Sequence, residues 1–389
     1  MANAPLKDLK VVELARVLAG PWIGQTLADL GANVIKVESP EGDDTRKWSP
    51  PSIETNDEVT AAYFHACNRG KRSIVADFST SEGRDIVIAL AHWADVLIEN
   101  FKVGGLQRYG LDYEALSAIN PRLIYCSVTG FGQTGPYAAR AGYDFMIQGM
   151  SGIMDLTGDP SGEPQKMGVA FADIFTGLYG VIAIEAALLA RAQTGRGQHI
   201  DMALFDCMTG VLANQAMNYL ATGISPTRMG NAHPNIAPYQ TFPVIDGHVI
   251  IAVGNDSQFK HLCDVLELDG VATAPQFMTN VLRVTNQKEL FARLASATQT
   301  CNREALLTAL DAAGVPAGPI NTVADVFDDP QFQSRNMRIN PQGVPGLRTP
   351  IVMSESPLNL ERRSPGLGEH TEEILRELGI SVKARRDYA

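Results

Sequence analysis

Short apolar runs alternate with stretches of helical spacing through the N-terminal half of the chain. Runs rich in β-branched and apolar residues, which are typical of strands, occupy positions 9–14, 33–37, 73–78, 94–98 and 121–128. Apolar residues recur with helical spacing over 21–30 and 82–92. The run VIKV at 34–37 has no polar alternation, as in parallel strands that are buried on both faces. The pattern therefore predicts βαβ units and a mainly parallel sheet.

A segment rich in Pro, Gly and Asn at 223–243 interrupts this pattern and is expected to be a linker or lid. A new unit follows, with a strand at 248–253 and helices at 257–266 and 286–297. A chain of 389 residues exceeds the usual size of one core. We expect an α/β protein whose large, doubly wound, Rossmann-like domain spans 1–220 and is completed by 331–389. A smaller α/β domain should span 226–330, after the linker.

The charge balance argues against polyanionic partners. Lys and Arg number 32 and Asp and Glu 43, which gives a net charge of −11 with no basic run, so neither nucleic acid nor a membrane is expected as a partner. The most apolar helical stretch, 178–190, contains Glu185 and is shorter than the ~20 residues of a membrane span. Five scattered cysteines without a C-x-x-C pair indicate free thiols. These features, with a start that lacks a signal-peptide pattern, predict a cytoplasmic protein.

The usual cofactor motifs are weak or missing. Residues 130–135 match G-x-G-x-x-G, but Pro136 follows and no helix opens there, so a glycine-rich turn at the end of a strand is expected instead of a dinucleotide site. No His pair has metal-ligand spacing, and no metal site is expected. Carboxylates and tyrosines remain as the candidate catalytic groups.

Asp173 stands out because it heads a long apolar segment, expected to form a helix over 173–191. Two interpretations are open: Asp173 caps the helix through backbone N–H groups, or it performs chemistry. The two roles are compatible, since a helix N-terminus would lower the pKa of the carboxyl group and keep it ionised.

Several motifs, in order along nearly the whole chain, point to a known family. They are LAGP (18–21), LGANVIKVE (30–38), GDDTR (42–46), Asn68 with KRS (71–73), ENF (99–101), AGYD (141–144), TGRGQ (194–198) and GLGEHT (366–371). On these motifs the chain resembles the family III CoA-transferases, the formyl-CoA transferase and carnitine CoA-transferase group. The resemblance implies that Asp173, in the segment GVAFAD, is the catalytic nucleophile.

The chemistry implied by the resemblance suits a carboxylate. Asp173 would attack an acyl-CoA thioester to form a mixed anhydride, and the CoA thiolate would then convert the anhydride into an aspartyl-CoA thioester. Coenzyme A is a substrate here, so no cofactor is expected. The partners are CoA thioesters and small carboxylic acids, and two chains are expected to interlock as rings in a homodimer.

The resemblance also implies a CoA-binding set, in which Tyr143 and Asp144 belong to the substrate site. Val17 and Leu18 are expected near the pantetheine. The residues expected near the nucleotide are Lys71, Arg72, Ala76 and Asp77. Those expected near the phosphates are Asn100, Phe101 and Arg108. Lys71 and Arg72 could instead belong to a solvated turn, and Arg108 to a surface ion pair. Ala141 stands where formyl-CoA transferase has a lysine contact, and the multi-glycine loop of that enzyme is absent, so neither contact carries over.

Two other functions remain open. Racemases of the same superfamily act next to a CoA thioester, but they have a histidine where this chain has Tyr143, whose ordinary pKa near 10 makes a poor base. The other alternative is a CoA-binding protein without turnover, which an intact Asp173 argues against.

The strings 140–144, 177–179 and 230–240 resemble the branch that transfers CoA from succinyl-CoA to dicarboxylates such as glutarate, itaconate, mesaconate or malate. A dicarboxylate needs a cation for its distal carboxylate, and Arg46 and His233 are the candidates. Arg46 could instead pair with Asp43 or Asp44, and His233 could pack within the linker.

Overall fold

The computed structural model describes residues 4–55 and 58–380, and its contacts divide into two units. The first comprises 1–153, 166–217 and 331–389, and the second 154–165 and 218–330. Segment 154–165 thus groups with the second unit, whereas the sequence had placed it in the large domain. The ends of the predicted large domain, 1–3 and 381–389, lie outside the described residues.

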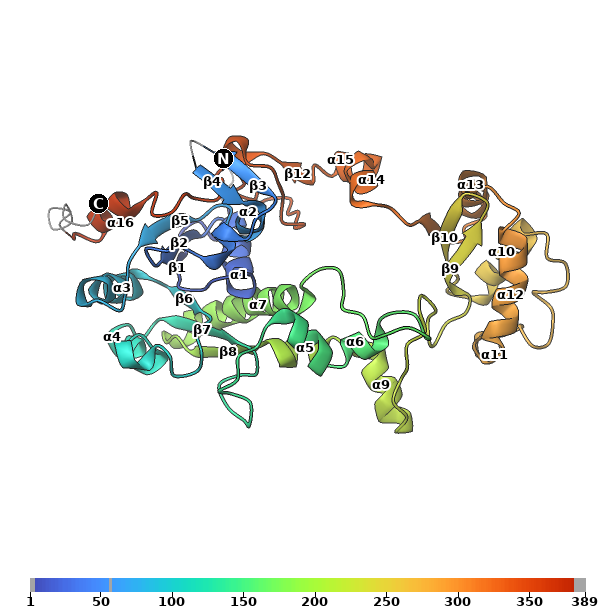
Figure 1. The fold of residues 1–389 in the computed structure, drawn as a ribbon, viewed down its shortest axis with the longest axis horizontal. Coiled ribbons are helices and arrows are strands. Elements are labelled where there is room, and N and C mark those ends of the chain that lie inside the picture. The colour runs from blue at the N-terminus through green and yellow to red at the C-terminus, as the bar shows by residue number, and fades with distance from the viewer. Residues whose placement is uncertain (1–3, 56–57, 381–389) are drawn as a thin grey trace. The chain divides into compact units, whose positions relative to one another are not determined.

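A six-stranded parallel sheet forms the centre of the first unit (Figure 1). Its strands, in spatial order, are β5 (Arg72–Val75), β2 (Asn33–Glu38), β1 (Lys10–Glu13), β6 (Val96–Glu99), β7 (Ile124–Thr129) and β8 (His199–Ala203). The predicted α/β fold with a large parallel sheet is confirmed. The chain order reverses between β1 and β6, and such a switch point opens a crevice at the carboxyl ends of the strands.

Apolar side chains pack into a core on each face of this sheet. In β1, Val11 and Val12 point to opposite sides and enter different cores. The core around Val11 is closed by α1 (Ala19–Asp29), α5 (Asp144–Met150), α7 (Phe171–Thr194) and α8 (Leu204–Gly210). The core around Val12 is closed by α3 (Ser81–Trp93), α4 (Tyr113–Ile119) and α16 (Thr371–Glu377). This two-sided burial explains why the strands lack polar alternation.

Helix α7 is longer than the sequence suggested: its 24 residues end at Thr194, and the φ of 74° of the next residue, Gly195, is typical of a helix C-terminus. Its length and apolar composition alone are those of a membrane span, as for many buried core helices, so the expected absence of a membrane partner stays a prediction. One side of α7 packs closely on α1: a Cβ added to Gly180 would lie 2.4 Å from the side chain of Ile23. This close approach brings the start of α7 to the switch point.

The C-terminal segment completes the first unit along β5. The N–H of Gly368 donates to Oγ of Ser73 at 2.9 Å, and the N–H of Val75 donates to Oγ1 of Thr371 at 3.2 Å. The guanidinium of Arg72 pairs with Glu373 and Glu377 on α16 at 2.7 and 2.8 Å. The closing motif at 366–371 and helix α16 therefore dock on the edge of the sheet.

The second unit contains a three-stranded antiparallel sheet and helices. Its main elements are β9 (Tyr239–Val244), β10 (Gly247–Ala252), β11 (Ala317–Pro319), α10 (Asp256–Val265), α11 (Asn280–Thr285), α12 (Gln287–Thr298) and α13 (Arg303–Ala312). The end of the expected linker, 239–243, belongs to β9. The buried side chain of Phe242 explains this correction, since it joins the core of the unit.

Short elements connect these parts. They are η1 (Asp44–Lys47), β3 (Ser52–Thr55), β4 (Glu58–Ala61), α2 (Ala62–Cys67), η2 (Gln107–Tyr109), α6 (Ile153–Leu156), α9 (Ala213–Thr222), α14 (Val323–Asp328), α15 (Pro330–Ser334), β12 (Arg338–Ile339), η3 (Pro341–Gly343) and β13 (Gly346–Leu347). The antiparallel pairs β3–β4 and β12–β13 had not been predicted.

Candidate active site

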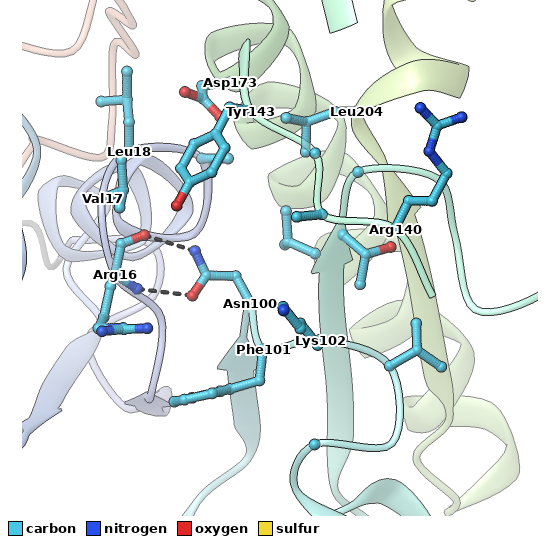
Figure 2. A pocket seen from close by; sticks show the side chains of 18 of the residues that line it. Arg16, Val17, Leu18, Asn100, Phe101, Lys102, Arg140, Tyr143, Asp173 and Leu204 are labelled. Carbon is cyan, nitrogen blue, oxygen red and sulfur yellow. Dashed lines mark hydrogen bonds between the residues drawn. The ribbon is translucent and has the colours of Figure 1, made fainter. Parts of the chain in front are cut away.

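A cavity of about 510 Å³ lies in the first unit at the carboxyl ends of β1, β6 and β7 (Figure 2). Its walls come from the segments that follow these strands, 16–19, 100–109 and 128–130, together with 138–143 and Asp173. This is the switch point of the sheet, where doubly wound folds bind their ligands.

The carboxyl group of Asp173 reaches the cavity from the first turn of α7. The N-cap of α7 is Ala170, so the predicted capping role of Asp173 is wrong. Within residues 4–55 and 58–380 its side chain has no hydrogen-bond partner. Burial, with a smaller contribution from the charge of Asp144, raises the pKa of Asp173 to about 7. The expected lowering of this pKa is also wrong, because desolvation outweighs the effect of the helix N-terminus.

Asp144 holds the start of α7 and does not line the cavity. Its Oδ1 accepts the N–H of Ala172 at 2.8 Å, and its Oδ2 accepts from Nε2 of Gln148 at 2.8 Å. Asp144 thus places a second negative charge near Asp173 while fixing the backbone beside it.

Asn100 joins the two chain segments that diverge at the switch point. Its Oδ1 accepts the N–H of Arg16 at 2.9 Å, and its Nδ2 donates to the carbonyl of Arg16 at 2.6 Å (Figure 2). Asn100, Phe101 and Arg108 all line the cavity, as do Val17 and Leu18. Their contacts with CoA stay predictions.

Val17 has a strained backbone at this point, with φ of 71°. A left-handed conformation is rare for a β-branched residue and costs on the order of 1–3 kcal/mol. Its N–H donates to Oδ1 of Asp43 at 3.3 Å, and its carbonyl accepts from Sγ of Cys67 at 3.4 Å. Helix α1 begins at Ala19, and both its N-cap residue, Leu18, and Ala19 line the cavity; among the described residues, no side chain caps the first turn. Pro21 has no N–H and that of Trp22 donates to the carbonyl of Leu18 at 2.7 Å, so in this turn the N–H groups of Ala19 and Gly20 are the ones available to an anion.

Two glycines position Tyr143. The segment after β7 crosses the segment 140–143 so closely that a Cβ on Gly142 would lie 2.4 Å from Cα of Gly130. Only residues without a side chain allow this crossing. The side chain of Tyr143, which is 68% exposed, follows at once and lines the cavity.

The cavity is lined by four cationic side chains, Arg16, Lys102, Arg108 and Arg140. Only Arg108 had been predicted. Arg16 and Lys102 follow β1 and β6 on either side of the switch point, and this position was the signal that could have identified them. Cations here suit the phosphates and carboxylates of CoA and small acids.

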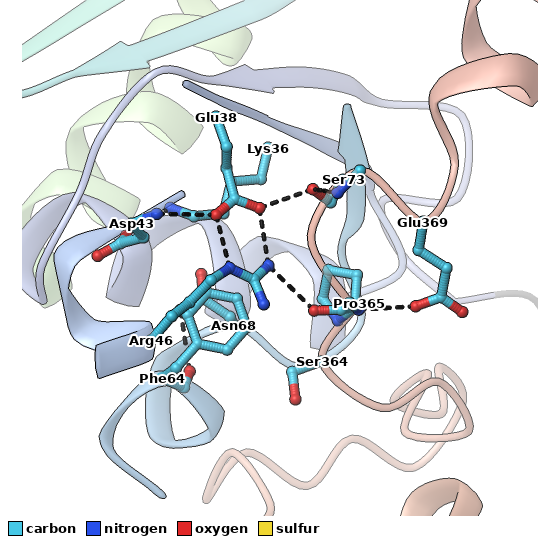
Figure 3. A network of polar contacts seen from close by, with 12 residues as sticks. Lys36, Glu38, Asp43, Arg46, Phe64, Asn68, Ser73, Ser364, Pro365 and Glu369 are labelled. Atoms are coloured by element: carbon cyan, nitrogen blue, oxygen red, sulfur yellow. Dashed lines mark hydrogen bonds and ion pairs between the residues drawn. The ribbon is translucent and has the colours of Figure 1, made fainter. Parts of the chain in front are cut away.

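Other predicted residues are engaged elsewhere in the first unit. Lys71 is completely buried and pairs with Oε2 of Glu13 at 2.7 Å. Arg46 makes two bonds of 2.8 Å with the carboxylate of Glu38 and lies over the ring of Phe64 (Figure 3). Releasing either cation to a ligand would take an ion-pair partner away from a buried carboxylate, which is costly. These placements correct the predictions that Lys71 contacts the nucleotide and that Arg46 binds the distal carboxylate.

For three further residues, the predicted contact with the nucleotide stays a prediction. Arg72 is held by the carboxylates of α16, and Ala76 is buried. The carboxylate of Asp77 accepts the N–H of Ser79 at 2.9 Å. Neither Arg72, Ala76 nor Asp77 lines the cavity, although the next residue, Phe78, does.

His233 belongs to the second unit. Its Nδ1 accepts the N–H of Asn235 at 3.0 Å, and its ring lies 5.2 Å from that of Tyr239. The packing role considered for His233 is therefore present, and a role in binding substrate stays a prediction. In the part of the chain that the structure describes, no group of three or more His, Cys, Asp or Glu side chains is placed to hold a metal ion.

The sequence analysis did not identify Tyr63, on α2, as a neighbour of Asp173. Burial raises the pKa of its phenol above the ordinary value, and the charge of Asp173 raises it further, so the two groups are electrostatic neighbours. No motif or strand end marks Tyr63 in the sequence.

Fold and site together define an α/β protein with a carboxyl group, unpaired among the described residues, in a cation-lined cavity at the switch point of a doubly wound sheet. The chain belongs to CoA-transferase family III, whose family model matches residues 6–371.

Similar proteins agree with this family. The chain is 56% identical to a succinate–glutarate CoA-transferase of Agrobacterium fabrum, over 96% of each chain. It is 40% identical to the human succinyl-CoA:glutarate CoA-transferase, over 96% of this chain and 86% of that one. The crystal structure of a CAIB/BAIF family protein from Brucella suis matches with 69% identity and a TM-score of 0.89, over 97% of this chain and 100% of that one.

The raised pKa of Asp173 predicts a pH dependence of CoA transfer. A carboxylate attacks only when deprotonated, so kcat/KM should fall below about pH 7, tenfold per pH unit. Asp144→Asn removes the neighbouring charge but keeps an oxygen for the N–H of Ala172. The acid limb of the kcat/KM profile should then move to lower pH.

Glu99 is the matched control, because burial raises its pKa to about 7 as well. Glu99→Gln should leave the position of the acid limb unchanged. The assignment to Asp173 would be contradicted if the acid limb kept its position in Asp144→Asn but disappeared in Glu99→Gln.

Proposed function

We propose that this chain transfers CoA from succinyl-CoA to a small dicarboxylic acid, with Asp173 as the acyl acceptor. The observation that carries the proposal is the carboxyl group of Asp173, which is partly buried, unpaired in the described chain and located in the cation-lined cavity. The names of the two curated relatives support succinyl-CoA and a dicarboxylate as substrates.

The reaction runs as four acyl transfers. The carboxylate of Asp173 attacks the thioester carbonyl, which forms a mixed anhydride and releases CoA thiolate. The thiolate attacks the aspartyl carbonyl, which forms an aspartyl-CoA thioester and releases the donor acid. The acceptor carboxylate attacks this thioester to form a second anhydride and thiolate. The thiolate then attacks the acceptor carbonyl, so the new acyl-CoA leaves and the carboxylate of Asp173 is restored.

The surroundings of Asp173 support these steps. Each step passes through an oxyanion, and the uncapped N–H groups of Ala19 and Gly20, in the first turn of α1, are its proposed donors. Partial burial limits the access of water to the anhydride and the thioester. The racemase alternative gains no support, because the position of its base is held by Tyr143, which is mostly exposed.

Asp173→Asn should abolish transfer, lowering kcat by at least about a thousandfold, because an amide cannot serve as the nucleophile. In wild-type protein incubated with succinyl-CoA alone, the peptide that contains Asp173 should gain the mass of CoA less water. Hydroxylamine should discharge this adduct, as measured by mass spectrometry.

The matched control is Asp155→Asn, on an exposed carboxylate of α6, which should keep both the activity and the adduct. Near-normal turnover by Asp173→Asn, or an adduct on another carboxylate, would refute the proposed mechanism.

Arg140 is the cation that we propose for the distal carboxylate, in place of Arg46. Its guanidinium lies over the rings of Tyr137 and Phe131, with 4.5 and 5.5 Å to the centroids. In the described part of the chain it forms no ion pair with an acidic side chain, and it lines the same cavity as Asp173. The ring contacts hold it in place, while its charge stays available.

Arg140→Ala should raise KM for glutarate by roughly tenfold or more, since a hydrogen bond to a charged group contributes about 1.5–3 kcal/mol. It should change KM for a monocarboxylate much less. Arg108→Ala, at another cation of the cavity, should instead raise KM for succinyl-CoA. Equal losses for both classes of acid in Arg140→Ala would mean that Arg140 serves CoA or the general geometry.

We further propose a homodimer of interlocked rings, as in the family that the sequence resembles. Helix α7 leaves one apolar stripe uncovered in the single chain, with Ile182 60% and Leu189 70% exposed. Leu178 and Ile182 lie four residues apart, and Leu189 seven further on, so all three share one side of the helix. A second copy of the chain would bury this stripe.

The protein should sediment as a dimer even at nanomolar concentration, because interlocked chains separate only by unfolding. Ile182→Glu should prevent assembly, whereas Glu185→Gln, nearby on the same helix, should not. A folded, active monomer in the wild-type protein would exclude the interlocked dimer.

A further inference from the structure

Two carboxylates and two ammonium groups are buried together beneath the end of β1. Glu13, Lys36 and Lys71 have no exposed surface, and Asp43 has 1%. The Nζ of Lys36 lies 3.1 Å from Oε1 of Glu13 and 2.9 Å from Oδ2 of Asp43. Lys71 pairs with the other side of Glu13. The four charges balance, which allows the group to remain buried.

Asp43 is the member of this group that contacts the cavity wall. Its Oδ2 is held by Lys36, and its Oδ1 accepts the N–H groups of Thr45 and Val17 at 3.0 and 3.3 Å. Figure 3 shows Asp43 beside Lys36, with the pair of Glu38 and Arg46 next to it. The same carboxylate therefore touches a buried cation and the strained backbone of Val17.

We propose that Asp43 is a positioning residue for CoA transfer: it holds Val17 in its left-handed conformation and thereby aims the first turn of α1 at the cavity beside Asp173. The inference rests on the proposed role of Asp173. It assigns to the buried charges a function in the reaction beyond the stability of the fold.

The physical reason is the cost of the Val17 conformation. A valine at φ of 71° relaxes toward negative φ unless its neighbours prevent it. Relaxation would rotate the peptide groups that lead into α1 and move the N–H groups of its first turn. These donors matter most when negative charge develops on the reacting carbonyl, so their displacement should lower kcat more than it raises KM.

A double-mutant cycle between Asp43 and Val17 tests this. Asp43→Ala should lower kcat about tenfold to hundredfold, as expected for donors displaced by about an ångström, while KM for succinyl-CoA changes less than about threefold. Val17→Gly adopts the left-handed conformation without strain, so it no longer needs Asp43. In the Val17→Gly background, Asp43→Ala should therefore lower kcat by no more than about twofold.

Asp29→Ala is the matched control. Asp29, at the end of helix α1, is completely buried and paired with Arg69, which follows α2, and it does not touch Val17. Its loss should lower Tm about as much as Asp43→Ala does, leave kcat of the folded protein within about twofold, and show no coupling to Val17→Gly. If Asp43→Ala does not fold, Lys36→Met/Asp43→Ala removes both charges, and the same loss of kcat and the same rescue are expected.

Equal loss of kcat by Asp43→Ala in the Val17 and Gly backgrounds would overturn the inference, as would a loss confined to Tm. The aspartyl-CoA adduct separates this outcome from failure of the proposed function. An adduct on Asp173 without coupling refutes only the role of Asp43. A wild-type protein that forms no adduct on Asp173 refutes the mechanism itself.

Discussion

The reversal of strand order between β1 and β6 is the constraint on which the site depends. Two chain segments leave the sheet there in opposite directions, and the crevice between them must be stabilised. The side chain of Asn100 does so directly, through two hydrogen bonds to the backbone of Arg16. Beneath the same segment, the buried charges of Asp43 and Lys36 fix the conformation of Val17. The shape of the cavity at this point therefore depends on buried charges and hydrogen bonds as well as on packing.

The carboxyl group of Asp173 shows how burial serves two opposing needs. An anhydride and a thioester must be protected from water, which favours a partly buried site. The same burial disfavours the charged carboxylate and raises its pKa to about 7, so some of the protein is in the wrong protonation state near neutral pH. A carboxylate that accepts no hydrogen bond from residues 4–55 and 58–380 is, in return, less stabilised and more reactive as a nucleophile. The negative charge of Asp144 contributes to the raised pKa of Asp173 and further destabilises its carboxylate.

The parallel sheet could be predicted because its strands are continuous apolar runs, and Asp173 because of its family motif. The buried cations could not. Lysine and arginine side chains usually reach solvent, so the burial of Lys71 and Arg46 is not expected from their residue types. Their contacts also include residues far away in sequence: Arg46 donates to the carbonyl of Pro365, 319 positions further along the chain. Arg140 was not predicted as a site residue because its position at the cavity depends on the close crossing of Gly130 and Gly142, which only the folded backbone shows. Similarly, 239–243 read as a linker because Pro, Gly and Asn surround the few residues that form β9.

Oxygen exchange tests the central claim, that Asp173 accepts the acyl group, most directly. In the proposed reaction, the acceptor acid forms an anhydride with Asp173, and cleavage at the acceptor carbonyl leaves one acceptor oxygen on the aspartate. Turnover of succinyl-CoA with dicarboxylic acid labelled with oxygen-18 in its carboxylates should therefore place the label in the peptide that contains Asp173. Mass spectrometry of a digest measures this. Full conversion of substrate with no label on that peptide would contradict the account.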